Sequence, residues 1–272
     1  MILIDNVKVE FGVFPNNERY LNYNKITFHN SSVVVLKFET DQDLMDLYIL
    51  RSYMNDVIPN NIMTLKILYM PYSRMDRANN TYTFNLKYIC DMINAMHFAR
   101  VKVVDAHSDV STALLNRCTN ISIIPALMAL FVDKHGMDNT ILFYPDAGAE
   151  KRYSHVARYP SAVGSKERDF KTGDIIKYSV SGTGVKGKKV LIVDDLCSKG
   201  GTFIAAAEAL KSHGAANIYL MVAHCEHTIF SGKIFTSKLI DEVYTTNSIM
   251  CNSTALENLI IHQLYTEVKR DA

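Results

Sequence analysis

The sequence has almost no surplus charge, few cysteines and no long apolar run. Its 29 Lys and Arg residues nearly balance 28 Asp and Glu residues, leaving a net charge of +1. Proteins that bind nucleic acid through its phosphate backbone carry a basic excess, so we expect no nucleic-acid partner. The longest apolar stretch, 121–132, contains a serine and a proline and is shorter than the roughly 20 residues needed to cross a bilayer. We therefore expect no membrane partner.

The 5 cysteines stand singly, with no CxxC pair and an odd number, which argues against a disulfide framework and a zinc ribbon. Such usage is typical of a reducing compartment. The N-terminus has no basic segment and only a short apolar run, so no signal peptide is expected. These features predict a cytoplasmic protein.

Short apolar segments bounded by turn residues predict buried strands, and amphipathic stretches between them predict helices. The predicted strands are 33–38, 65–69, 101–105, 141–144, 190–193 and 218–222, and the predicted helices are 41–56, 84–96, 125–135 and 202–213. This alternation is typical of α/β proteins with mainly parallel sheets flanked by helices. A polar break at 136–139 predicts two domains, 1–138 and 139–272. The segment 165–183 is predicted to form a mobile loop followed by a hairpin.

The most informative segment is 190–203, VLIVDDLCSKGGTF. A buried strand ends in two carboxylates, Asp194 and Asp195, and a glycine loop then opens a helix. Glycines let backbone N–H groups approach a phosphate, and the helix N-terminus adds a favourable dipole. Carboxylates beside a phosphate cradle make sense if they accept hydrogen bonds from sugar hydroxyls, so the pattern predicts a ribose 5-phosphate site. A simple helix cap at Ser198 or Thr202 explains the turn but not the acidic pair.

This segment resembles the phosphoribosyl-pyrophosphate-binding signature shared by type I phosphoribosyltransferases and ribose-phosphate pyrophosphokinases. Further segments resemble elements of the pyrophosphokinases alone, in the order that the family has them. They are Phe14–Glu18 (FPNNE), Met70–Arg77 (MPYSRMDR), Asp105–His107 (DAH), Pro145–Gly148 (PDAG), Lys166–Arg168 (KER) and His227–Gly232 (HTIFSG). The resemblance runs from Phe14 to about Leu264, which is nearly the whole chain.

The resemblance implies two tandem phosphoribosyltransferase-like domains, the first binding ATP and the second carrying the ribose-phosphate loop and a catalytic flexible loop. It implies an Mg²⁺-dependent transfer of the β,γ-pyrophosphoryl group of ATP to the anomeric hydroxyl of a ribose 5-phosphate moiety, with release of AMP. Lys166 and Arg168 would be catalytic, and His107 and Asp146 would arrange magnesium. The implied ATP-binding residues are Phe14, Glu18, Arg74, Asp76, Arg77 and His107. The implied sugar-phosphate-binding residues are Asp194, Asp195, Ser198, Lys199, Gly200, Gly201 and Thr202.

The phosphate loop departs from the family pattern Asp-Thr-Gly/Ala-Gly-Thr, because Ser198 and Lys199 stand in place of Asp-Thr. The change removes an acid and adds a cation, which favours a diphosphate over a single terminal phosphate. Two acceptors therefore stay open: ribose 5-phosphate, and a 5′-extended acceptor such as ADP-ribose. The first belongs to nucleotide biosynthesis and the second would connect the reaction to NAD metabolism.

Two alternatives to the diphosphokinase stay open as well. A type I phosphoribosyltransferase would require a base and would not use ATP. A non-catalytic regulatory homologue would bind nucleotides or a catalytic partner without turnover. For the diphosphokinase, the expected partners are ATP and a ribose 5-phosphate-type acceptor, and a homo-oligomer of at least two copies is expected.

Overall fold

The computed structural model describes residues 1–26, 29–58, 60–156, 159–168, 175–250 and 256–267. The chain forms two compact units, Met1–Ser122 with the described residues 264–267, and Ile123–Gln263. The predicted boundary between residues 138 and 139 thus moves to a point before helix α4 (Ile124–His135). The reason is packing, because Leu127 and Phe131 of this helix lie in the core of the second unit.

The first unit is built on a six-stranded sheet in the order β2-β1-β5-β6-β7-β8. Strands β5 to β8 are parallel, whereas β1 pairs antiparallel with both β2 and β5. The elements are β1 (Ile2–Ile4), β2 (Val7–Lys8), β3 (Phe11–Val13), β4 (Arg19–Leu21), a 3-10 helix (Tyr23–Lys25), β5 (Ser31–Leu36), α1 (Gln42–Val57), β6 (Ile62–Ile67), α2 (Asn85–Ala95), β7 (Arg100–Val104), α3 (Asp109–Leu114) and β8 (Cys118–Ile121). Strands β3 and β4 form a separate hairpin.

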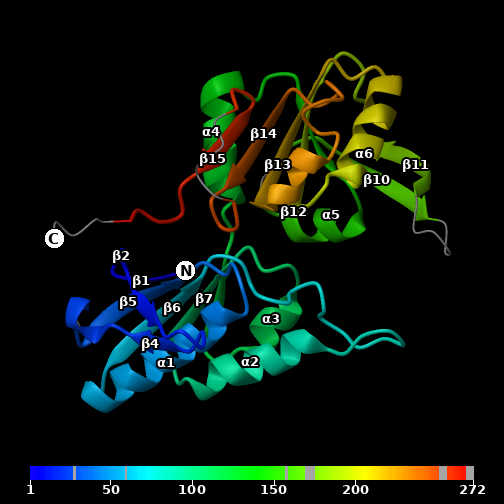
Figure 1. The fold of residues 1–272 in the computed structure, drawn as a ribbon. Coiled ribbons are helices and arrows are strands. Elements are labelled where there is room, and N and C mark those ends of the chain that lie inside the picture. The colour runs from blue at the N-terminus through cyan, green and yellow to red at the C-terminus, as the bar shows by residue number, and fades with distance from the viewer. Residues whose placement is uncertain (27–28, 59, 157–158, 169–174, 251–255, 268–272) are drawn as a thin grey trace. The chain divides into compact units, whose positions relative to one another are not determined.

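Along each strand of this sheet, successive side chains point to opposite faces. Val34 and Leu36 of β5 and Leu65 and Ile67 of β6 are fully buried in one core with the apolar side chains of α1 and α2. Figure 1 shows α1, α2 and α3 together on that side of the sheet. The intervening residues therefore point to the opposite face, and Lys66 is among them.

The second unit is a seven-stranded sheet in the order β11-β10-β9-β12-β13-β14-β15. Apart from β11, which runs antiparallel to β10, neighbouring strands are parallel. After α4 the elements are β9 (Thr140–Tyr144), α5 (Ala147–Tyr153), β10 (Ser161–Arg168), β11 (Ile175–Gly182), β12 (Lys189–Cys197), α6 (Gly201–Ser212), β13 (Asn217–Cys225), a 3-10 helix (His227–Ser231), β14 (Glu242–Thr246) and β15 (Leu259–His262).

Helices cover both faces of the second sheet, as seen in Figure 1. Val190 and Ile192 of β12 pack with α6, whereas Leu191 and Val193 pack with α4 and α5. A strand buried on both faces appears as the continuous apolar run of residues 190–193. The predicted fold class, two α/β domains with mainly parallel sheets flanked by helices, is confirmed.

All the predicted strands and helices are present, with ends shifted by a few residues. The largest shift is in β12, which continues to Cys197 because its backbone stays paired with β13 as far as Cys225. Asp194 and Asp195 consequently lie inside the strand near its carboxyl end. The segment 165–183 was predicted to be a mobile loop followed by a hairpin. Instead, residues 165–168 end strand β10 and residues 175–182 form β11, and the two strands pair with each other antiparallel. Residues 169–174 lie outside the described residues.

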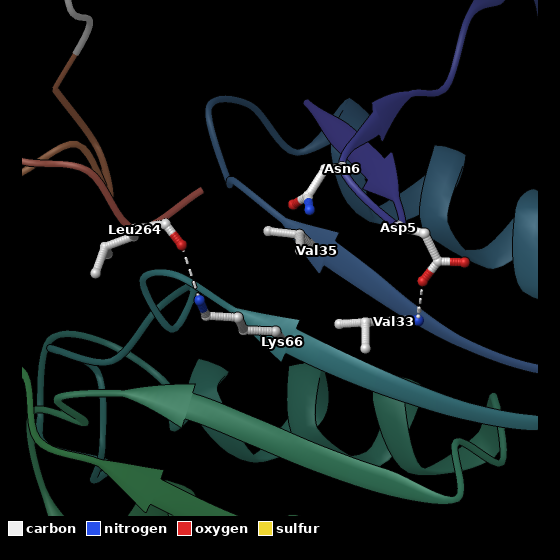
Figure 2. A pocket seen from close by; sticks show the side chains of 6 residues that line it. All are labelled: Asp5, Asn6, Val33, Val35, Lys66 and Leu264. Atoms are coloured by element: carbon white, nitrogen blue, oxygen red, sulfur yellow. Dashed lines mark hydrogen bonds between the residues drawn. The ribbon is translucent and has the colours of Figure 1, made fainter. Parts of the chain in front are cut away.

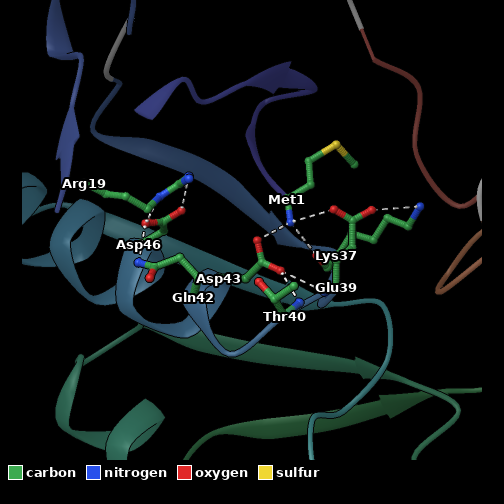
Figure 3. Close-up of polar contacts among 8 residues, drawn as sticks. All are labelled: Met1, Arg19, Lys37, Glu39, Thr40, Gln42, Asp43 and Asp46. Atoms are coloured by element: carbon green, nitrogen blue, oxygen red, sulfur yellow. Dashed lines mark hydrogen bonds and ion pairs between the residues drawn. The ribbon is translucent and has the colours of Figure 1, made fainter. Parts of the chain in front are cut away.

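Polar contacts fix the β3–β4 hairpin and the chain start to α1, as Figure 3 shows. Arg19 of β4 donates two hydrogen bonds to the buried Asp46 of α1, with Nε 2.9 Å from Oδ1 and Nη2 2.6 Å from Oδ2. The Met1 ammonium donates to Asp43 of the same helix. This hairpin carries Phe14 and Glu18 in its loop, so the contact with Asp46 positions two of the candidate ATP-binding residues.

Candidate functional site

The acidic pair and the glycine loop lie where β12 leads into α6. The Asp195 N–H donates to Asp194 Oδ1 at 2.9 Å, and Asp195 is buried. Gly200 has φ +81°, and a Cβ there would lie 2.4 Å from the Ile234 side chain. Only glycine suits this position, since the left-handed backbone is strained for other residues and there is no room for a side chain. Helix α6 then begins at Gly201 with no acidic residue in its first turn, which leaves its N-terminus suited to an anion.

The backbone before Gly200 is held by the segment that follows β13. A Cβ at Gly232 would lie 2.0 Å from the Lys199 carbonyl oxygen, so the two backbones are in close contact. The Ser198 and Thr228 hydroxyl oxygens are 3.1 Å apart, and Thr228 in turn donates to Glu226. Lys199 itself is exposed. The loop is therefore rigidly supported while its one cation faces solvent.

Arg152 is a site residue that the sequence did not reveal. Its Nη1 lies 2.5 Å from Asp195 Oδ1, and neither side chain is more than 23% exposed. Burial alone would lower the pKa of the guanidinium, but the charge of Asp195 reverses this and raises it. Burial, followed by repulsion from Asp195, raises the pKa of Asp194 well above its ordinary value. Arg152 thus compensates one acid of the pair, and the other is held in an environment that disfavours its charge.

Asp146 and Tyr178 lie near the same strand ends. Asp146 caps helix α5, where its Oδ1 accepts the Ala149 N–H at 3.0 Å. The Tyr178 hydroxyl donates to the Pro145 carbonyl at 2.8 Å. Burial raises the pKa of Tyr178, and the charges of Asp146 and Asp194 add to the shift, so both carboxylates act on this phenol. Tyr178 was not predicted as a site residue. For Arg152, the one feature of the sequence that could have indicated a role was a basic residue in the last turn of the helix that Asp146 begins.

Lys166 and Arg168, the predicted catalytic residues, lie near the carboxyl end of β10, where this strand pairs with β11. The register places Lys166 opposite Tyr178 and Arg168 opposite Ile175. Their backbone is described, whereas their side chains lie outside what the structure describes. Strand β10 neighbours β9, which leads to Asp146, so the sheet brings the two segments together.

In the first unit, Phe14 and Glu18 lie in the loop of the β3–β4 hairpin. The Phe14 N–H donates to the Glu18 carbonyl at 2.8 Å, and the Phe14 ring packs on Tyr20 with centroids 4.8 Å apart. Phe14 is nevertheless 52% exposed. An exposed aromatic ring on a fixed hairpin is suited to stacking on a planar group.

The remaining ATP candidates follow the carboxyl ends of β6 and β7. Arg74 and Arg77 are exposed, and Arg77 Nε lies 3.6 Å from Asp76 Oδ1. His107 follows a strained turn in which Asp105 has φ +39° and donates its N–H to the Ile121 carbonyl. Parallel strands gather such residues at one edge of a sheet, where ligands of open α/β folds bind.

The predicted residues are thus distributed over two units. All the sugar-phosphate candidates, with Asp146, belong to the second unit, and all the ATP candidates belong to the first. The predicted metal pair, His107 and Asp146, is divided between them. Within the described ranges, no group of three or more His, Cys, Asp and Glu side chains could hold a metal ion. In the same part of the chain, no helix is both long and apolar enough to span a membrane.

The described residues thus form two α/β units, and in the second unit an acidic pair precedes the glycine loop that begins α6. Residues 177–267 match the family model described as a phosphoribosyl synthetase-associated domain. The chain is 30% identical over 235 residues to a ribose-phosphate pyrophosphokinase of Marinomonas sp., covering 83% of this chain and 72% of that one. It is also 30% identical over 252 residues to the enzyme of the same name from Pyrococcus furiosus, covering 89% and 86%.

Among solved structures, the fold is similar to that of phosphoribosylpyrophosphate synthetase from Mycobacterium smegmatis. The TM-score is 0.79 at 19% identity, over 95% of this chain and 86% of the other. The chain belongs to the ribose-phosphate pyrophosphokinase family.

Proposed function

We propose that this protein is a diphosphokinase that transfers the β,γ-diphosphoryl group of ATP to the anomeric hydroxyl of a ribose 5-phosphate moiety. The anomeric oxygen forms a bond to the β-phosphorus and its hydroxyl proton is released to solvent, while the bond from that phosphorus to the α,β-bridging oxygen breaks and AMP leaves. The observation that carries the proposal is the acidic pair Asp194 and Asp195 beside the loop that begins α6, in a chain of this family. We assign the acceptor to the second unit and ATP to the first.

In the second unit, Asp194 and Asp195 would accept hydrogen bonds from ribose hydroxyls. The loop Ser198–Thr202 would hold the 5′-phosphate with its hydroxyls, its backbone N–H groups and the N-terminus of α6. Lys166 and Arg168 would stabilise the negative charge on the transferring group, since such transfer depends chiefly on positioning and charge.

In the first unit, Phe14 and Glu18 would contact adenine from the hairpin. Arg74, Asp76 and Arg77 would line the ATP site after β6, and His107 would hydrogen-bond a phosphate after β7.

The proposal includes Mg²⁺, and the residues present fit this ion in part. Asp146 offers carboxylate oxygen at the end of β9, the donor that Mg²⁺ prefers, and Mg²⁺ keeps several waters besides one or two protein ligands. His107 offers nitrogen, which suits a hydrogen bond to a phosphate better than magnesium. Bound Mg²⁺ would neutralise charge on the β- and γ-phosphates.

The acceptor is the finer part of the proposal. Lys199 is exposed on the rigid loop, next to a helix N-terminus, and this combination favours a diphosphate. We therefore propose ADP-ribose as an acceptor beside ribose 5-phosphate.

The testing experiment measures AMP formed from ATP and Mg²⁺ with ribose 5-phosphate, with ADP-ribose and with no acceptor. Acceptor-dependent AMP supports diphosphoryl transfer, whereas a base requirement without ATP use would indicate a phosphoribosyltransferase. Absence of AMP despite confirmed ATP binding would favour a regulatory homologue. Lys199→Thr should shift preference toward ribose 5-phosphate, and Lys186→Thr, an equal charge change before the amino end of β12, should not. An unchanged preference in Lys199→Thr would contradict the role assigned to Lys199.

A further inference from the structure

A pocket of about 290 Å³ lies in the first unit, over strands β5 and β6 of its sheet. It is lined by Asp5, Asn6, Val33, Val35, Lys66 and Leu264, which Figure 2 shows as sticks. Val33, Val35 and Lys66 belong to the sheet face opposite the helices. Neither the ATP candidates nor the acceptor candidates include any of these residues.

The lining changes in chemical character across the sheet. Asp5 and Asn6 form the turn between β1 and β2, with φ of +48° and +69°. Val33 and Val35 lie on the neighbouring β5 and form an apolar floor, and Lys66 lies on β6 beyond them. Adjacent strands are about 4.8 Å apart, so the polar turn and the ammonium are separated by about 10 Å across the strands. That spacing matches the separation of base and phosphate in a nucleoside monophosphate.

The charges at the two ends differ. Lys66 Nζ donates to the Leu264 carbonyl at 2.9 Å, which aims the ammonium into the pocket, as Figure 2 shows. Lys102 is the register partner of Lys66 on β7. Burial lowers the pKa of Lys66, and repulsion from Lys102 lowers it further. An anion at this end would relieve the repulsion between two neighbouring ammonium groups.

The opposite end of the pocket, at Asp5 and Asn6, offers hydrogen-bonding groups but no positive charge that would attract an anion. Asp5 Oδ1 accepts the Val33 N–H at 2.8 Å, which fixes the turn against β5. In Figure 2 the Asn6 amide lies beside this floor, where it can both donate and accept. An amide of this kind can pair with the edge of a planar heterocycle whose faces rest on apolar side chains.

We propose that this pocket is a second nucleotide site that binds a nucleoside 5′-monophosphate. The phosphate lies at Lys66 with Lys102 nearby, the base covers Val33 and Val35, and the edge of the base meets Asn6. The size suits a small ligand, since 290 Å³ lies just below the range of about 300–1,000 Å³ that is typical of small-molecule sites. The proposal is independent of the reaction proposed above, because it requires binding and no turnover.

Photolabelling with 8-azidoadenosine 5′-monophosphate tests the site in the chain of residues 1–272. Covalent label is located by tryptic digestion and mass spectrometry. We expect label on the peptides 1–8 or 26–37, which carry Asn6 and the two valines, in addition to any label near the ATP candidates. Lys66→Met should reduce label on these two peptides by about ten-fold, as expected for loss of a charge-assisted hydrogen bond. Lys87→Met, which removes an exposed lysine from α2, is the matched control and should leave the label unchanged.

Competition separates the nucleotide from its phosphate. Unlabelled AMP should protect the two peptides at much lower concentration than inorganic phosphate. Equal protection by both would show that the nucleoside contributes nothing and would overturn the nucleotide assignment. Label absent from both peptides at saturating probe, or label that persists in a folded Lys66→Met protein, would overturn the site itself. Catalytic activity has no part in these measurements, so the proposed reaction and this site can fail separately.

Discussion

Replacing Arg152 by Met tests whether the acidic pair depends on a buried counter-ion. The guanidinium Nη1 lies 2.5 Å from Asp195 Oδ1, and the side chains are 23% and 7% exposed. Methionine preserves much of the stem but leaves Asp195 buried beside Asp194 without this cation. Removing one partner of a buried ion pair costs about 3–5 kcal/mol, because the remaining charge loses its compensation. For a chain of this size that corresponds to a fall in melting temperature of roughly 6–20 °C.

Urea unfolding at pH 7.5 measures this loss directly, and two controls separate its causes. The double variant Arg152→Met with Asp195→Asn should recover most of the stability, because the unpaired charge is gone, but not activity. For the single variant the deficit should shrink as pH falls, since an unpaired carboxylate can take up a proton. A single variant within about 1 kcal/mol of the wild type at pH 7.5 would refute the assigned role, because a buried pair would then be absent in solution.

Three further changes probe the site and its support. Asp194→Asn should stabilise the unliganded protein and abolish AMP formation. The pKa of Asp194 is raised in the folded protein, so its ionised form, which prevails as pH rises, destabilises the fold. The increase in stability on replacement by Asn should therefore be larger at pH 7.5 than at pH 4.5 in thermal unfolding. Gly200→Ala should cost about 2–4 kcal/mol from left-handed strain and overpacking, whereas Gly201→Ala, whose Cβ meets nothing within 4 Å, should be nearly neutral in urea unfolding. Asp46→Ala should release Arg19 and raise KM for ATP several-fold, with little change in KM for the acceptor in steady-state assays; equal changes in both would contradict a local role for the hairpin.

The strands buried on both faces were predictable because their apolar runs carry the signal. Residues 190–193 and 218–222 needed no knowledge of their neighbours to be identified as strands. The short strands β1, β2 and β15 were not predicted, because strands of two to four residues are too short to show a period. The domain boundary was misplaced for a related reason: the polar break after α4 is visible in the sequence, but the sheet on which α4 packs is not.

The residues of the candidate site likewise include some that the sequence could reveal and some that it could not. Asp194, Asp195 and the glycine loop are contiguous in sequence, so their chemistry was visible as a pattern. Arg152 was not, because its role depends on the adjacency of β9 and β12, which brings the helix after one strand to the carboxylates of the other. Long-range pairing of this kind leaves no spacing in the sequence.

The electrostatics of the site explain how two carboxylates can stand beside a phosphate loop. Adjacent acids would repel a bound phosphate, and the loop itself offers only Lys199 as a cation, exposed to solvent. Arg152 compensates Asp195 within the protein, so the pair presents less than two negative charges to a ligand. The raised pKa of Asp194 works in the same direction, because a carboxylate that is costly to ionise gains from each hydrogen bond that a sugar hydroxyl donates to it. An acceptor whose hydroxyls reach Asp194 would therefore lower that pKa on binding and release a proton at pH values between the pKa of the free site and that of the complex. Calorimetry in buffers of different ionisation enthalpy would detect this release, and its persistence in Asp194→Asn would assign the proton to another group.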